Sequence, residues 1–135
     1  MIAYVDSAER ITADQLGGFF EGWSAPPSPE THLRLLAGSD HVILATDDQT
    51  GAVVGFITAI SDGVLCAYIS LIEVRSGYRG QGIGSELTRR MLDKLKGLYT
   101  TDLLCDPELR PFYARMGMTP VTGMTLKDFD RPSGH

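Results

Sequence analysis

The chain has few cysteines, few histidines and fewer basic than acidic residues. Its 135 residues include two cysteines and three histidines, and the net charge is −5. This charge argues against a surface for nucleic acid or an anionic membrane, and it mildly favours a cationic substrate such as an amine. Cys66 and Cys105 lie in apolar runs, so we expect buried free thiols rather than a bridge. Two cysteines without a histidine at ligand spacing predict no metal site.

Long apolar segments are also absent. No stretch of 18 residues is apolar throughout, and Met1–Asp6 lacks the basic region and apolar core of a leader. We therefore expect a cytoplasmic protein that does not bind membranes. The length suits a single domain over residues 1–135, and 43% hydrophobic residues are enough for a packed core.

The most informative stretch is glycine-rich and reads VRSGYRGQGIGS from Val74 to Ser85. It follows the apolar run 64–74 and precedes a helical pattern, so a strand leads through a turn into a helix start. First-turn amides of a helix lack internal partners, and glycines let a phosphate approach them. Arg79 adds a cation with a planar donor fork. The stretch predicts a diphosphate cradle; the alternative is a tight connection that binds nothing.

Spacing excludes the two common phosphate loops. The dinucleotide fingerprint needs G-x-G-x-x-G, but Gly80, Gly82 and Gly84 give G-x-G-x-G. The nucleoside-triphosphate loop needs a lysine where Ile83 stands. What remains is the pattern Arg79-x-x-Gly82-x-Gly84.

Hydrophobic periodicity and turn residues divide the chain into strands and helices. Strands are expected at residues 2–5, 41–46, 52–60, 64–74, 100–105 and 119–126. Helices are expected after a capping box at 12–15, from Pro29 to Gly38, from Gly84 to Lys96 and from Pro107 to Met116, before a frayed tail at 128–135. Runs 52–60 and 64–74 are apolar on both faces, which indicates covered central strands. The order predicts an α/β protein with a mixed sheet and helices on both faces.

The pattern R-x-x-G-x-G resembles the acyl-CoA-binding signature of the GNAT superfamily of N-acyltransferases. A second stretch, from Asp106 through Tyr113 to Met118, resembles the family's downstream motif N-x6-Y-x3-G-F. The resemblance covers nearly the whole chain and implies a mostly antiparallel sheet of six or seven strands with about four helices. Ser76, Asp106 and Met118 depart from the family's usual proline, asparagine and aromatic residue.

The resemblance also implies roles for individual residues. The main chain of Ile72 and Val74 would pair with the pantetheine arm of acetyl-CoA, and Asp106 replaces an asparagine that contacts it. The loop amides would hold the pyrophosphate; they belong to Arg79, Gly80, Gln81, Gly82, Ile83, Gly84 and Ser85. Tyr113 would act as general acid beside the thioester sulfur. The alternative for Tyr113 is ordinary core packing on one stripe with Leu109, Phe112 and Met116.

Glu73 is the only charged residue in the run 64–74, and a carboxylate in a central strand is costly unless it is paired or solvated. We interpret it as the base or the amine-orienting group; the alternative is an ion pair with Arg75 or Arg79 that supports the loop. Tyr68, Ser70 and Trp23 are candidates for lining the acceptor pocket. His32 and His41 are expected at the surface or in packing. Four basic side chains follow the loop, and we expect them either to contact the outer phosphate of CoA or to lie on a solvated helix face; they are Arg89, Arg90, Lys94 and Lys96.

These observations predict an acetyl-CoA-dependent N-acetyltransferase that acts directly on a primary amine of a small molecule or peptide. The main alternative is a non-catalytic acyl-CoA-binding sensor or regulatory module, and a third is a protein-interaction domain that binds no nucleotide. We expect no metal and no nucleic-acid partner. A homodimer is left open, because dimers are common among relatives.

Overall fold

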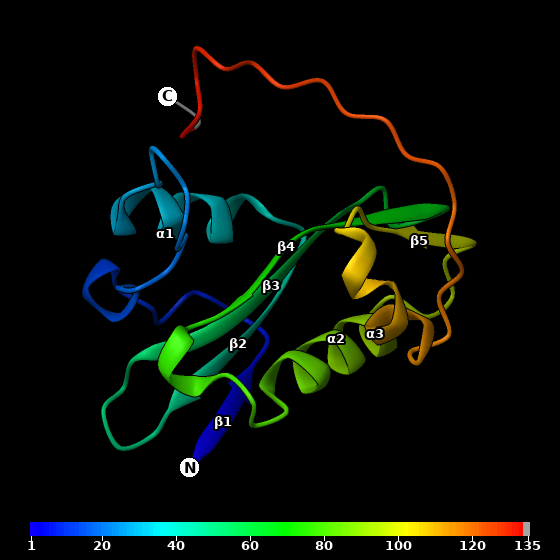
Figure 1. The fold of residues 1–135 in the computed structure, drawn as a ribbon. Coiled ribbons are helices and arrows are strands. Elements are labelled where there is room, and N and C mark those ends of the chain that lie inside the picture. The colour runs from blue at the N-terminus through cyan, green and yellow to red at the C-terminus, as the bar shows by residue number, and fades with distance from the viewer. Residues whose placement is uncertain (134–135) are drawn as a thin grey trace.

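A five-stranded sheet forms the centre of the computed structural model, which describes residues 1–133 (Figure 1). Strands β1 (Ile2–Val5), β2 (His41–Asp47), β3 (Val53–Ser61) and β4 (Cys66–Val74) are antiparallel neighbours in this order. Strand β5 (Thr100–Asp102) runs parallel to β4 at the sheet edge. The predicted mixed, mostly antiparallel sheet is confirmed, but the predicted six or seven strands are wrong.

Helices cover both faces of this sheet. Helix α1 (Pro29–Gly38) lies on one face, and α2 (Ile83–Lys94) with the short α3 (Arg110–Ala114) lies on the other (Figure 1). On the α2 face, Ile83, Leu87 and Met91 pack against apolar residues of β2, β3 and β4. On the α1 face, a second cluster is built around Leu36 and Phe56. Strand β3 is buried from residue 53 to 59, as predicted, whereas the start of β4 is open to solvent at Cys66 and Tyr68.

The ends of α1 and α2 follow from local sequence. Ser28 Oγ accepts the Thr31 N–H at 3.1 Å and Pro29 takes the first position, so the predicted cap is confirmed. Helix α2 begins after Gly82, whose φ of +82° is left-handed and suits glycine. The residue at the N-cap therefore sets the start of each helix: Ser28 for α1 and Gly82 for α2.

The helix expected after Thr12 does not form. The Thr12 N–H donates to Gln15 Oε1 at 2.9 Å, but only a 3-10 turn follows, at Ala13–Gln15. Gly18 and Phe20 then take positive φ values of +87° and +62°, which reverse the chain. Two adjacent glycines, 17 and 18, favour this loop because glycine is costly inside a helix. The described residues therefore contain three α-helices rather than about four.

The strand expected at 119–126 does not form either, and β5 ends at Asp102 rather than Cys105. Residues 119–126 are extended but have no neighbouring strand within residues 1–133, and a strand requires one. Figure 1 shows this segment arching from α3 towards α1. Of the expected frayed tail, residues 134 and 135 lie outside the described part; Ser133 Oγ donates to the Ala25 carbonyl.

Both cysteines are free, as expected, but both are exposed, so the prediction of buried thiols is wrong. Cys66 begins β4 at the open end of the sheet, and Cys105 follows the short β5. An apolar run in sequence does not guarantee burial at the end of a strand or beyond it, where neighbouring elements leave the side chain uncovered. Across residues 1–133, no helix has the length and apolar character needed to cross a membrane.

Candidate active site

The outer edge of β4 leaves main-chain groups unpaired. The Arg75 N–H donates to the Val54 carbonyl at 2.8 Å, and Val74 lies opposite Gly55 in the register. Because bonding alternates along an antiparallel pair, the main chains of Ile72 and Val74 face away from β3. On that side β5 pairs only with residues 66–68. The Ile72 N–H and carbonyl and the Val74 N–H therefore have no strand partner within the described residues.

The glycine-rich loop adds free donors beside this edge. Gly80 and Gly82 have φ values of +80° and +82°, and the space that a Cβ would take is open to 4 Å at both. Across residues 1–133, the N–H groups of residues 82–85 meet no acceptor. They lie at the positive end of the α2 dipole. Free N–H groups beside the open space at Gly80 and Gly82 fit a bound diphosphate.

The Arg79 side chain is engaged with the protein itself. Its Nε donates to the Val74 carbonyl at 2.9 Å, and its guanidinium lies 3.1 Å from the Glu21 carboxylate. Both members of this ion pair are about half exposed. Arg79 thus joins the glycine-rich loop to β4 and to the loop that contains Glu21.

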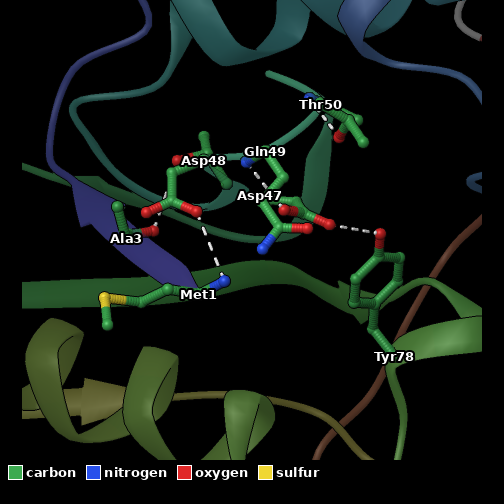
Figure 2. A network of polar contacts seen from close by, with 9 residues as sticks. Met1, Ala3, Asp47, Asp48, Gln49, Thr50 and Tyr78 are labelled. Atoms are coloured by element: carbon green, nitrogen blue, oxygen red, sulfur yellow. Dashed lines mark hydrogen bonds and ion pairs between the residues drawn. The ribbon is translucent and has the colours of Figure 1, made fainter.

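Tyr78 anchors the same loop to the turn between β2 and β3, and sequence reasoning missed it. Its hydroxyl donates to Asp47 Oδ2 at 2.8 Å, as Figure 2 shows. This bond lowers the pKa of Asp47, which also accepts the Gln49 N–H, and it raises the pKa of Tyr78. The sequence marked Asp47 only as a turn residue, so nothing indicated its partner 31 positions away.

Glu73 binds a backbone amide rather than an arginine. Its two carboxylate oxygens accept the Phe20 N–H at 2.9 and 3.0 Å, and the Glu21 N–H lies 3.5 Å away. The alternative of an ion pair with Arg75 or Arg79 is not what the structure forms. Phe20 is the one non-glycine residue with a positive φ in the described chain. A residue in this region is strained and is kept there by its surroundings, which is typical of functional sites.

The predicted acceptor-lining residues have different environments. The Trp23 ring contacts the Phe20 ring edge-on at 5.1 Å and is partly exposed, as is Tyr68 on β4. Ser70 is the extra residue of a β-bulge, since Leu71 pairs with Thr58 and Ile69 with Ala59. Its hydroxyl lies 2.8 Å from the buried Thr58 hydroxyl.

Tyr113 and Asp106 come from the other side of the sheet. The Tyr113 ring on α3 is buried against Phe112, and within residues 1–133 its hydroxyl forms no hydrogen bond with the protein. Burial, with a smaller contribution from Cys105, raises the pKa of Tyr113, so the phenol stays protonated at neutral pH. Asp106 precedes the 3-10 turn Pro107–Leu109, and its carboxylate makes no capping bond there.

His32 occupies a site that the sequence left undecided between surface and packing. It is fully buried, with ring centroids 5.3, 4.8 and 4.4 Å from those of Phe19, Phe20 and Phe56. Neither ring nitrogen has a partner. Desolvation lowers its pKa to about 4, so the imidazole is neutral at physiological pH. Within the described residues, no group of three or more His, Cys, Asp or Glu side chains is placed to hold a metal.

The chain is similar in sequence and structure to known acetyltransferases. Residues 8–118 match the Acetyltransferase (GNAT) family. A candidate acetyltransferase from Deinococcus radiodurans R1 has a similar structure, with 46% identity, a TM-score of 0.95, and coverage of 99% of this chain and 93% of that one. A GNAT family acetyltransferase from Streptococcus pneumoniae TIGR4 shows 28% identity, a TM-score of 0.76, and coverage of 96% and 99%.

The curated relatives are longer proteins. Glucosamine 6-phosphate N-acetyltransferase 1 of Oryza sativa subsp. japonica is 29% identical over 108 residues, which cover 69% of this chain and 66% of that protein. The chain spans 55–66% of the length of the curated relatives it matches. The family match extends over more than half of the chain and includes both the glycine-rich loop and Tyr113. The chain therefore belongs to the GNAT family of acetyltransferases.

Proposed function

We propose that this chain transfers an acetyl group directly from acetyl-CoA to a primary amine of a small molecule or peptide. The observation that carries the proposal is the continuity of unpaired main-chain groups. Ile72 and Val74 offer an open strand edge, and the free N–H groups of residues 82–85 follow within the same strand–turn–helix unit. An extended pantetheine chain suits the edge and a diphosphate suits the helix start.

Each step of the transfer has a candidate group. Bound acetyl-CoA supplies the activated thioester. The amine nitrogen forms a bond to the carbonyl carbon as the carbon–sulfur bond breaks; the amine loses a proton and the departing thiolate gains one. The phenol of Tyr113, kept protonated by burial, is the donor to the thiolate. Glu73 is the group that receives or orients the amine, because a carboxylate has lone pairs beyond those used by the Phe20 N–H.

An amino-sugar phosphate is the first acceptor to test. Two rice relatives carry glucosamine 6-phosphate N-acetyltransferase names, one with 32% identity and one with 29%. In this chain the partly exposed rings of Trp23 and Tyr68 offer flat apolar surface on the acceptor side. The acceptor of this chain is therefore proposed only as a primary amine, and glucosamine 6-phosphate is one of the amines to be tested.

The experiment is a free-thiol release assay with acetyl-CoA and a panel of amines, together with calorimetry of CoA binding. We expect CoA to bind and thiol release to depend on at least one amine. CoA binding without turnover on any amine favours the alternative of an acyl-CoA-binding module. If CoA gives neither heat of binding nor a thermal shift, both the acetyltransferase and the acyl-CoA-binding module are overturned. The chain would then be a domain that binds no nucleotide.

A further inference from the structure

Two segments on the side where we place the acceptor carry negative charge only. They are the loop 11–28, which contains Phe20, and the hairpin 52–74 of β3 and β4, which contains Glu73. Neither segment has a lysine, an arginine or a histidine, and their four carboxylates belong to Asp14, Glu21, Asp62 and Glu73. Within residues 1–133, Glu73 binds the Phe20 N–H and forms no ion pair. Its charge therefore favours an ammonium group and disfavours an anion.

The arginines of the neighbouring elements do not cancel this charge. Arg34 on α1 lies two positions from each of the two buried residues of that helix, and residues two apart do not share a helix face, so it points away from the sheet. Arg75 packs against the loop, with its Nε 2.8 Å from the position that a Cβ on Gly18 would take. Arg79 is paired with Glu21 at 3.1 Å.

Beyond Glu73, the same face of the hairpin becomes apolar and exposed. Phe56 pairs with Glu73 and belongs to the cluster beneath α1, and side chains alternate along β3, so Ile60 lies on this face too. Tyr68 is the cross-strand partner of Ile60, and the two are 40% and 54% exposed. Trp23, which is 46% exposed, borders this side from the loop. We call Ile60, Tyr68 and Trp23 the apolar strip.

We propose that the acceptor is an apolar primary amine, with an aromatic or alkyl body that carries no phosphate or carboxylate. This inference rests on the proposed acetyl transfer and narrows its acceptor. The ammonium group lies at Glu73 and the body lies along the apolar strip. The pairs Phe56–Glu73 and Ile60–Tyr68 are four residues apart on β3, or about 13 Å. A phenyl ring on a short alkyl chain spans most of that distance, and its burial against exposed rings is favourable.

An amine that also carries a phosphate fits this side less well. Glucosamine 6-phosphate would bring a dianion beside Glu73 and Glu21, where the loop and the hairpin offer it no cation. Removing water from a phosphate without a cationic partner is costly, and like charges repel. The net charge of −5 acts in the same direction, because it attracts a cation and repels an anion over longer distances.

The first test uses Trp23, the single tryptophan of the chain, whose fluorescence reports on the acceptor side. With CoA present, the full chain is titrated with 4-phenylbutylamine, butylamine and glucosamine 6-phosphate. We expect 4-phenylbutylamine to change the emission and to bind about tenfold more tightly than butylamine and about 100-fold more tightly than glucosamine 6-phosphate. Equal or tighter binding of glucosamine 6-phosphate overturns the inference. Binding in this order without thiol release would overturn acetyl transfer but support the apolar amine as the ligand.

The second test places a cation on the apolar strip. In Ile60→Lys we expect the Kd of 4-phenylbutylamine to rise and that of glucosamine 6-phosphate to fall, so that their ratio changes about 100-fold. Tyr68→Lys should change the ratio in the same direction, so the result does not depend on one site. Val5→Lys, on β1 at the opposite sheet edge and 42% exposed, is the matched control and should leave the ratio unchanged.

Folding is checked by circular dichroism and melting temperature in all three variants. Because the replaced side chains are 40–54% exposed, we expect each variant to keep the wild-type spectrum. An unchanged ratio in both folded strip variants, or an equal change in Val5→Lys, rules out the apolar strip as the acceptor surface. A changed ratio in the strip variants alone supports it, because a general loss of stability would weaken the binding of both ligands.

Discussion

The carboxylate of Glu73 holds the backbone N–H of Phe20, with its oxygens at 2.9 and 3.0 Å. Phe20 has a left-handed φ of +62°, and its ring contacts both Trp23 and His32. One charged residue of β4 thus fixes a loop that lies 53 positions earlier in the sequence. Glu73 thus fixes the loop on the proposed acceptor side, and in the proposed reaction the same carboxylate would meet the amine.

Replacing Glu73 with glutamine keeps one oxygen for the Phe20 N–H and removes the charge. We expect the kcat for amine acetylation to fall at least tenfold while the Kd for CoA stays within about twofold, because proton transfer by a placed group is typically worth about 10²–10⁴. Glu21→Gln, which removes a neighbouring charge from the exposed pair with Arg79, is the matched control. An equal loss in both variants would show that overall charge, not the Glu73 carboxylate, matters.

Tyr113→Phe removes the phenol but keeps the buried ring. We expect kcat to fall about tenfold or more with unchanged CoA affinity, measured by thiol release and calorimetry. Burial raises the pKa of Tyr113 above its ordinary value near 10, so the wild type should keep its proton donor through mildly alkaline pH. A raised pKa in the folded state means that the contribution of Tyr113 to stability is full below pH 10 and declines as pH rises further; the phenylalanine variant should show a smaller decline, because the pKa of Tyr78 is raised as well. Unchanged turnover would remove Tyr113 from the mechanism.

A methyl group at Gly82 tests the diphosphate cradle. Gly82→Ala places a Cβ in open space at the cap of α2, where the proposed diphosphate would lie, and we expect the Kd for CoA to rise about tenfold or more. Gly97→Ala is the control, because Gly97 also has a positive φ, +99°, and open space, but lies beyond α2. Both variants carry similar backbone strain, so a loss of stability that is common to both should not affect the comparison of their CoA affinities. Similar CoA affinity in the two variants would contradict the cradle.

Tyr78→Phe tests whether the bond to Asp47 positions the loop. The hydroxyl bond of 2.8 Å ties the glycine-rich loop to the turn after β2. Without it we expect the KM for acetyl-CoA to rise severalfold with kcat nearly unchanged, because in the proposed complex the loop would hold the diphosphate and not the reacting atoms. Asp47→Asn, which keeps an acceptor for the Tyr78 hydroxyl, should lose less. Loss of kcat without a change in KM would assign Tyr78 a different role.

Because His32 is buried as a neutral imidazole, we expect the free energy of unfolding to fall in acid. Its pKa falls from an ordinary 6.5 to about 4 on folding, so the contribution is complete above pH 6.5 and is lost as pH falls towards 4. Between pH 7.5 and 5 this single group should lower the free energy of unfolding by about 2 kcal/mol. His32→Phe, which suits the surrounding phenylalanine rings, should reduce that difference in urea unfolding at the two pH values. An unchanged pH dependence would show that another group is responsible.

Much of the fold could be predicted because local signals agreed with one another. The cap at Ser28, the strands at 2–5 and 41–46, and the turn into α2 at Gly82 each depend on residues close in sequence. The errors had one local and one tertiary cause. After the capping box at Thr12, two adjacent glycines ended the helix that we expected, and strand-like residues at 119–126 found no neighbouring strand within residues 1–133.

The sequence by itself determined the strand–glycine loop–helix unit and the order of the two motifs, because spacing and residue type fix backbone geometry locally. Only the tertiary structure decided that Glu73 meets Phe20, that Tyr78 meets Asp47, and that His32 lies among phenylalanine rings. These contacts join residues that are far apart in the chain. They depend on loop paths set by positive φ values and on packing across the sheet, which no local pattern records.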